Sequence, residues 1–551
     1  WALDLSPSGR PIGVIIASQP EQLFYLQLAD SVNRNSRNWI VLRERLQRAT
    51  GFQIVSHSAE QLSVLTEESL LFSDRIQDPM VAAWMLGFVQ GTAELRLNQV
   101  VERLIPSKLL PLVAAPPYLA MERAYYSLLV MPRLELELKR QHLWQPFCDV
   151  DMPLQSVLAE MMRVGFSIDR PLLSATLASI ESASQQLRQQ ILSAAGVPAD
   201  LDSARGIRRL LVQFVPPEVL GTVTEDRGAV AINKNTLRAL ASHHPAISLI
   251  IRLRSLQAIA PQAEKIFALS SNSGRVHSVF SSCRHANGRL VSEEPNLMGV
   301  PNDYEAVGMR LSLRTAFVPA PEHLLACFDY AQIELRLMAH FSGDRALRDS
   351  LTGPGDVFAN LAGCWLQKSS QDVSQAERRT VKQLVYGIAY GMGSKALAAQ
   401  LHVGLSEAIA LRTRFAEDFA GLKSWAEQVQ REAHTSGWVI TLGGRKRFFP
   451  QDFSSREQLA RQAVNAKCQG SAADIVKSAM VAVKRKFPNL HLLLQMHDEL
   501  IFEIPSSKLS ICRDIIQEME APFRQQLAVP LSVVLKVGVN WSNAALHQQQ
   551  L

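Results

Sequence analysis

Cysteine is scarce in this sequence, and long apolar runs are missing from it. The cysteines, at positions 148, 283, 327, 364, 468 and 512, form no CxxC pair and no Cys/His cluster at zinc-ligand spacing. This pattern excludes a zinc ribbon or a disulfide framework and favours a reducing compartment. No apolar stretch approaches the roughly 18 residues that a membrane-spanning helix requires, so we expect no membrane partner.

The first residues, WALDLSPSGRP, lack both an initiator Met and a charged start followed by an apolar run. We therefore expect no signal peptide, and we expect a segment cut from a longer protein. A chain of 551 residues is too long for one ordinary core, so two or more domains are expected. The formal charge of +6 and the pI near 9.0 are compatible with a polyanionic partner without requiring one.

The residue pattern changes twice along the chain. Up to about residue 140, short apolar runs such as IGVIIA alternate with helical patterns, which indicates a small α/β domain. From Asp151 to about Lys265, apolar residues recur three and four apart, which predicts a helical arm. After Ser271 the chain becomes dense in Gly, Pro, Asn and Arg, and three segments in this part point to chemistry.

The first segment is LLACFDYAQIELRLMAHFSGD, residues 324–344, in which a buried apolar run leads to Asp329 and then to a helical pattern. A carboxylate at the end of a strand is held rigidly, as a metal ligand must be. An Asp between a strand and a helix is more often a helix N-cap, however, and this segment alone favours the N-cap.

The second segment is LLLQMHDELIFEI, residues 492–504, which predicts two apolar strands joined at His497 and Asp498, with Glu499 just beyond. Charged residues at a tight turn are usually solvated. Burying three polar residues between such apolar runs is costly unless they serve a ligand. Because nucleotidyl transfer needs two carboxylates from separate elements to hold two Mg²⁺ ions, Asp329 and Asp498 are a candidate pair.

The third segment is ERRTVKQLVYGIAYGMG, residues 377–393. Arg378, Lys382, Tyr386 and Tyr390 recur every four residues and therefore share one helix face. A basic helix face is most often merely solvated, but two tyrosines that continue it are harder to explain in that way. Two cations followed by two rings suit a triphosphate followed by a sugar and base.

Taken together, DYAQIELR, RRTVKQLVYGIAYG and QMHDE resemble motifs A, B and C of the family A DNA polymerases, and further likeness covers about the last 400 residues. The resemblance implies an α+β right-hand fold with an antiparallel palm sheet and helical fingers and thumb. It implies an exonuclease-like α/β domain at 1–145 and a polymerase domain at 146–551. Within the latter, the thumb is expected at about 150–270, the palm at about 271–345 and 430–551, and the fingers at about 346–430.

The resemblance also implies catalytic and metal-binding roles. Asp329, Tyr330 and Asp498 would bind two Mg²⁺ ions, for which Mn²⁺ can substitute, and Glu499 would support that site. Lys382 would act in catalysis as well as in nucleotide binding. The implied partners are primer-template DNA and dNTPs, and the implied state is a monomer, which can be fused to further domains in a longer protein.

The same resemblance places the remaining site residues. Those implied to contact the incoming nucleotide are Arg378, Lys382, Tyr386, Tyr390, Glu334, Gln332 and His497. Glu334 falls on the steric-gate position that blocks a ribose 2′-OH, and Tyr386 goes with easy acceptance of dideoxynucleotides. Those implied to line the template-primer track are Arg289, Arg445, Asn465, Gln469 and Asn296. For Arg445 a merely solvated GRKR turn is an equally fair interpretation.

The subfamily implied is the eukaryotic polymerase theta and nu group, closest to theta, from stretches such as EPNLMGVPNDYE and RLSLRTAFVPAP. Asp4 matches an exonuclease carboxylate, whereas Ser6 and Arg123 stand where carboxylates are expected, so we expect no proofreading. Repair by end joining or translesion synthesis and a nuclear location, or else a mitochondrial one, are implied. The alternatives are a bacterial-type family A repair polymerase and a catalytically inactive DNA-binding scaffold.

Overall fold

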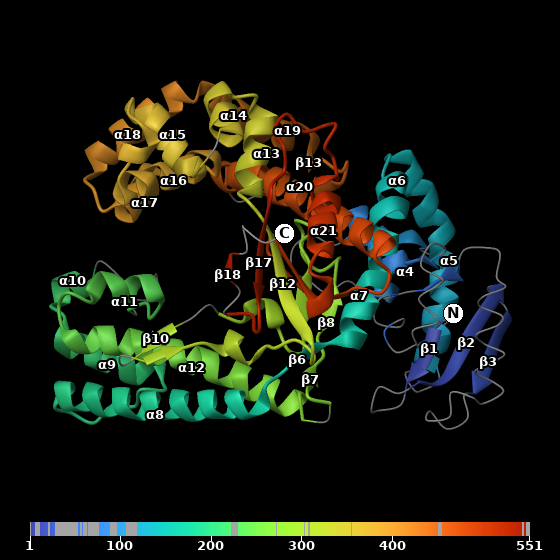
Figure 1. The fold of residues 1–551 in the computed structure, drawn as a ribbon, viewed down its shortest axis with the longest axis horizontal. Coiled ribbons are helices and arrows are strands. Elements are labelled where there is room, and N and C mark those ends of the chain that lie inside the picture. Colours follow the sequence, from blue (N-terminus) through green and yellow to red (C-terminus); the bar gives the residue numbers. More distant parts are fainter. Residues whose placement is uncertain are drawn as a thin grey trace.

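The fold is described by a computed structural model (Figure 1). It describes residues 2–5, 11–19, 22–27, 53–55, 58, 63, 76–88, 96–105, 118–221, 230–271, 273–301, 304–306, 309–353, 355–449, 455–542 and 545–546. Among these residues, no helix is both long enough and apolar enough to cross a membrane. Helices and strands both contribute to the cores, which confirms the mixed helix-and-strand prediction.

The N-terminal part pairs a small antiparallel sheet with helices. The sheet has the order β1-β2-β3, and a separate parallel pair joins β4 to β5. The elements are β1 (Ala2–Leu5), β2 (Pro11–Gln19), β3 (Gln22–Gln27), β4 (Gln53–Ile54), β5 (Ile76–Gln77), α3 (Pro79–Met85), α4 (Leu97–Leu104), α5 (Tyr118–Arg140) and α6 (Trp144–Pro146). The predicted exonuclease-like identity of this part is not supported. Of the residues on which it depended, Ser6 and the side chain of Asp4 lie outside the described residues, and Arg123 is exposed on α5.

The helical arm predicted from Asp151 onward is confirmed. The stretch comprises α7 (Met152–Val164), which packs against β15 and α20, then β6 (Phe166–Ser167), and the arm itself, α8 (Arg170–Ala195), α9 (Ala204–Phe214), α10 (Pro217–Gly221), α11 (Lys234–Leu240) and α12 (Pro245–Leu269). The two longest helices of the arm, α8 and α12, lie side by side at the lower left of Figure 1. Helix α8 begins where the Asp169 carboxylate accepts from the Leu172 amide, and it ends at Gly196, whose φ of +66° suits a residue without a side chain.

A five-stranded antiparallel sheet lies at the centre, with strand order β15-β16-β12-β17-β18. Its strands are β12 (His323–Tyr330), β15 (His491–Met496), β16 (Glu499–Pro505), β17 (Val533–Gly538) and β18 (Ala545–Leu546), and α20 (Arg456–Lys486) and α21 (Ile511–Glu520) pack together beside it. The two apolar strands predicted on either side of His497 and Asp498 are confirmed as β15 and β16. Consecutive apolar residues of β12 and β16 are buried, and because successive side chains point to opposite faces, both faces of these strands are covered.

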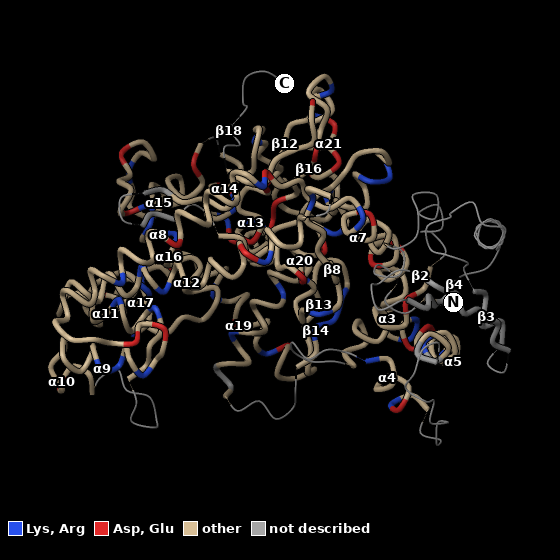
Figure 2. The backbone as a smooth tube through the Cα atoms, turned by 90° about the horizontal axis from the view of Figure 1, so that it is seen from below, with Lys and Arg blue, Asp and Glu red and all other residues tan. Residues whose placement is uncertain are grey.

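A second helical group has its own core and lies at the upper left of Figure 1. It comprises α13 (Ile333–Ser342), α14 (Arg345–Thr352), α15 (Val357–Leu366), α16 (Gln375–Ala389), α17 (Ser394–Leu401), α18 (Leu405–Asp418) and α19 (Ala420–Ser436). Short two-stranded ribbons complete the fold: β6 with β7 (Arg275–Val276), β8 (Val279–Ser281) with β9 (Val291–Glu293), β10 (Tyr304–Ala306) with β11 (Met309–Leu311), and β13 (Trp438–Ile440) with β14 (Lys446–Phe448). Acidic and basic positions are interspersed, and both signs occur around α13 and α20 (Figure 2).

Candidate functional site: a carboxylate centre beside a tyrosine-bearing helix

Asp329 lies within a central strand and not at a helix start. It belongs to β12, where it pairs with Glu499 on one side and with Val534 on the other. The following helix, α13, begins after Gln332, whose φ is +54° and whose side chain makes no capping hydrogen bond. The N-cap interpretation of Asp329 is therefore wrong. Two neighbouring strands hold the carboxylate, which is the rigidity that a metal ligand needs.

Asp498 lies beside Asp329 because the β15–β16 turn is fixed against the end of β12. The backbone amide of Tyr330 donates to the Asp498 carbonyl at 3.2 Å. His497 holds the turn with a left-handed φ of +55°. The register between Asp329 and Glu499 then brings a third carboxylate to the same end of the strands. The structure thus brings together the three acidic residues that the sequence placed in two separate segments.

Burial raises the pKa of all three carboxyl groups, and repulsion by the Asp329 charge adds to the rise for Glu499 and Asp498. Burial raises the pKa of Asp329, and burial followed by the Asp329 charge raises that of Glu499. The pKa of Asp498 rises to about 6, mainly through burial, while Glu334 and Asp329 add to the rise and Arg289 opposes it. Crowded, desolvated carboxylates are stabilised by a bound cation.

The donor set fits Mg²⁺ better than a metal held wholly by protein. Within the described parts of the chain, no group of three or more His, Cys, Asp or Glu side chains is arranged to hold a metal ion by itself. Mg²⁺ typically takes one or two carboxylates and completes its shell with water and substrate phosphates. Asp329 and Asp498 provide two carboxylates of this kind, while the metal role of the Tyr330 carbonyl and the supporting role of Glu499 stay predictions.

Glu334, in the first turn of α13, joins three elements. It accepts from Arg289 Nη2 at 2.7 Å and from the hydroxyl of Tyr390. The hydroxyl of Tyr386 donates to Gln332 Oε1 at 3.3 Å, and the two tyrosine rings stack with centroids 6.0 Å apart. The predicted shared helix face of α16 is therefore confirmed, and its aromatic end is directed at the first turn of α13.

Asn465 and Gln469 lie one turn apart on α20, and both are half-buried. Gln469 Oε1 accepts from Asn287 Nδ2 at 3.0 Å. The Oδ1 atom of Asn287 also accepts from the Arg289 amide at 3.1 Å. Asn287 therefore links Gln469 to Arg289, two of the residues predicted to contact DNA. The sequence analysis missed Asn287, although its place directly before Gly288 and Arg289 was a usable signal. Asn296 is held elsewhere: its side chain caps a short turn, and its carbonyl accepts from Gln262 on α12.

Arg445 is not the solvated turn residue of one sequence interpretation, because its side chain is buried; its predicted DNA contact stays a prediction. Its side chain is 3% exposed, and Nε donates to Asp474 Oδ1 at 2.7 Å. Nη2 donates to the carbonyls of Asn287 and Gly470, each at 3.1 Å. Gly288, with φ +85°, leaves the space for this guanidinium, since a Cβ there would collide with it. Arg445 therefore joins the loop that carries Asn287 and Arg289 to helix α20.

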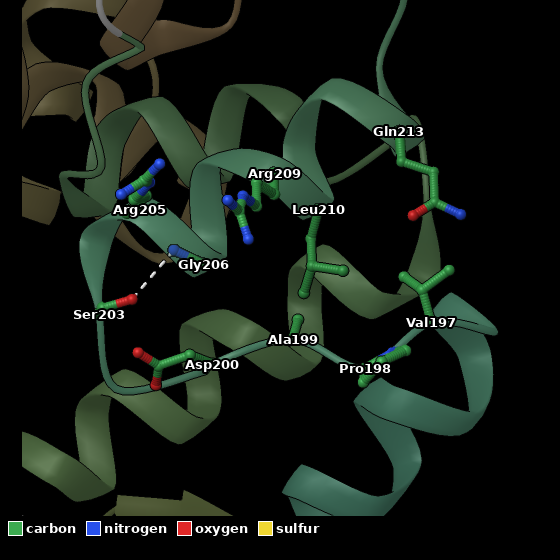
Figure 3. Close-up of a pocket in the computed structure, with 10 residues that line it drawn as sticks. All are labelled: Val197, Pro198, Ala199, Asp200, Ser203, Arg205, Gly206, Arg209, Leu210 and Gln213. Atoms are coloured by element: carbon green, nitrogen blue, oxygen red, sulfur yellow. Dashed lines mark hydrogen bonds between the residues drawn. The ribbon is translucent and has the colours of Figure 1, made fainter.

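A pocket of about 300 Å³ lies apart from these residues, in the arm between the end of α8 and α9 (Figure 3). Arg205 and Arg209 line one side of it, and Val197 and Pro198 the other. None of the predicted site residues lines this pocket. Its size alone does not connect it to the carboxylate centre.

Comparison with known proteins agrees with this geometry. Residues 170–543 match the family described as DNA polymerase family A. The chain belongs to DNA polymerase family A. This family A chain is 33% identical over 516 residues to the thermostable DNA polymerase I of Thermus filiformis, covering 91% of this chain and 58% of that protein. It is 31% identical over 493 residues to the DNA polymerase I of Treponema pallidum (strain Nichols), covering 85% and 48%.

A solved structure of a polymerase domain has a similar fold. The POL domain of Pol1 from M. smegmatis, in complex with DNA primer-template and dNTP, matches with a TM-score of 0.83 at 25% identity. The match covers 97% of this chain and 94% of that one, so the family A polymerase domain fold is confirmed. The chain spans about half the length of the curated relatives named above. These bacterial relatives give no support to a specific relationship with polymerase theta.

Proposed function

We propose that this chain is a template-directed DNA polymerase that adds deoxynucleotides to a primer 3′-OH. The observation that carries the proposal is that Asp329, at the end of β12, and Asp498, in the β15–β16 turn, lie close together beside the contacts that tie Glu334 to Arg289 and Tyr390. The solved relative, which is bound to primer-template and dNTP, supports the same substrate class. The inactive-scaffold alternative is disfavoured because Asp329, Asp498 and Lys382 are all present.

The chemistry follows from the carboxylate centre. Two Mg²⁺ ions, when bound, lower the pKa of the primer hydroxyl and neutralise charge as pyrophosphate leaves. Asp329 and Asp498 would hold them, with their carboxyl groups ionised by the ions despite the raised pKa values. Glu499 would add negative charge beside the two aspartates at the end of β12, and His497 would lie beside the primer end. Arg378 and Lys382 would bind the triphosphate, one as a fork and one as a point charge.

Selection for deoxyribose would rest on Glu334. Its carboxylate is held on both sides, by Arg289 and by the Tyr390 hydroxyl, so it has little freedom to move away from a 2′-OH. Tyr386 and Tyr390 would stack against the sugar and base of the incoming nucleotide. Asn465 and Gln469 would face the template-primer, and Arg289 would reach the minor-groove side of the primer end, where acceptors are common to all base pairs.

Of the two subfamily interpretations, we favour a bacterial-type repair polymerase over a theta-like one. The relatives at 33% and 31% identity are bacterial DNA polymerase I proteins. End joining, translesion synthesis and a nuclear or mitochondrial location follow only from the theta resemblance, so they stay predictions. The absence of proofreading also stays part of the proposal, supported by Ser6 in the sequence.

The test is extension of a 3′-recessed duplex with Mg²⁺, one dNTP at a time on four templates. We expect incorporation of the complementary deoxynucleotide only. A second duplex with a terminal mismatch separates extension from trimming. No extension with intact duplex binding would move the chain to the scaffold class, and trimming of the mismatch would contradict the predicted loss of proofreading.

A further inference from the structure

The arginine predicted to bind the triphosphate is held by a carboxylate that the sequence did not single out. Arg378 donates from Nε to Asp356 Oδ1 at 2.8 Å and from Nη2 to Asp356 Oδ2 at 2.7 Å. The same Oδ1 accepts from the Ala359 amide at 2.8 Å, so Asp356 is itself fixed at the start of α15. The pKa of Asp356 is lowered chiefly by the Arg378 hydrogen bonds, and that of Arg378 is raised by them.

Two residues further on, the ring of Phe358 lies beneath the same helix face. The guanidinium carbon of Arg378 is 5.6 Å from the ring centroid, and Lys382 Nζ is 5.4 Å from it. The ring of Tyr386 is 6.1 Å away, centroid to centroid. Phe358 is 1% exposed. One buried ring therefore contacts three of the four side chains on the α16 face.

We propose that Asp356 and Phe358 are positioning residues for the incoming triphosphate, acting through Arg378 and Lys382. This inference rests on the proposed function, because it assumes that these cations meet a triphosphate. The paired fork uses Nε and one Nη of Arg378, and among the described residues nothing accepts from Nη1. Asp356 thus fixes the guanidinium while Nη1 stays available, and the Phe358 ring lies against both Arg378 and Lys382.

Asp356 could either position the Arg378 guanidinium for phosphate or compete with phosphate for it, and the hydrogen bonds distinguish the two. A carboxylate that took every donor of Arg378 would compete with phosphate, whereas this one leaves the outer side of the fork unbonded. An arginine already ordered loses less conformational freedom when the nucleotide binds. Removing the pair is therefore expected to weaken nucleotide binding and not to strengthen it.

The test uses Asp356→Asn, because Asn caps a helix as well as Asp does and so preserves the start of α15. We expect the KM for dNTP to rise about tenfold, with kcat and primer-template affinity within about twofold of wild type. Asp349→Asn is the matched control, since Asp349 pairs with Arg345 on the neighbouring helix α14 at 3.5 Å and contacts no predicted site residue. Phe358→Leu, which keeps an apolar side chain and removes the ring, should also raise the KM.

A double-variant cycle decides whether Asp356 acts through Arg378. In an Arg378→Ala background, Asp356→Asn should add no further rise in KM. A full additional rise there, or an unchanged KM for both Asp356→Asn and Phe358→Leu, overturns this inference while leaving the polymerase proposal intact. A wild-type chain that does not extend primers overturns the proposed function and this inference with it.

Discussion

Replacing Arg445 with Met tests whether this residue is a buried support or a DNA contact. The substitution keeps an apolar stem and leaves the Asp474 carboxylate, whose side chain is 8% exposed, without its cationic partner. It also removes donors from the carbonyls of Asn287 and Gly470. Breaking a buried ion pair from one side costs about 3–5 kcal/mol, so the unit containing α20 should lose about that much free energy of unfolding.

The stability arm is chemical denaturation of wild type, Arg445→Met and Arg445→Met/Asp474→Asn. The double variant should recover about 2 kcal/mol, because no unpaired buried charge remains and Asn can still accept from the Gly443 amide. The binding arm is duplex affinity as a function of salt. A lost phosphate contact lowers the slope of log K against log salt by about one, whereas the buried role predicts an unchanged slope. A stable single variant with a reduced slope would refute the reasoning.

Three further predictions concern other residues. Burial favours neutral Glu160, but hydrogen bonds from His491 and Lys484 outweigh it and lower the Glu160 pKa below its usual 4.5. Their stabilisation is present above that value and lost as pH falls through the folded-state pKa, so Glu160→Gln should cost about 1–3 kcal/mol at about pH 7, and this cost should shrink steadily as the pH is lowered below 4.5, by denaturation midpoints. Tyr386→Phe should increase discrimination against dideoxynucleotides about tenfold or more, measured as the ratio of kcat/KM values, and an unchanged ratio contradicts the assigned role. Glu334→Ala should raise ribonucleotide incorporation about tenfold to a hundredfold relative to deoxynucleotide, and an unchanged preference would remove Glu334 as the gate.

Local patterns in the sequence were sufficient to predict several parts of the site. The β15–β16 hairpin around Asp498 follows from two apolar runs separated by polar residues, and the α16 face follows from a spacing of four. Both features depend on residues that are close together in the sequence, which is why the sequence alone was sufficient to predict them.

Partners distant in the chain were beyond the sequence. Arg445 and Asp474 are 29 residues apart and Arg289 and Glu334 are 45 apart, so no local spacing marks either pair. The solvated interpretation of Arg445 failed for this reason, because a basic run at a turn gives no sign of a buried carboxylate in α20. Likewise, the N-cap interpretation of Asp329 could be rejected only once strand pairing on both sides was known.

The central claim is that Asp329 and Asp498 together perform nucleotidyl transfer, and single-turnover incorporation by Asp498→Asn tests it most directly. The substitution keeps the size of the side chain and removes its charge. We predict that wild type incorporates the templated dNTP, whereas Asp498→Asn binds the same primer-template with similar affinity and loses at least about a thousandfold in rate. An Asp498→Asn rate within about tenfold of wild type would contradict the claim.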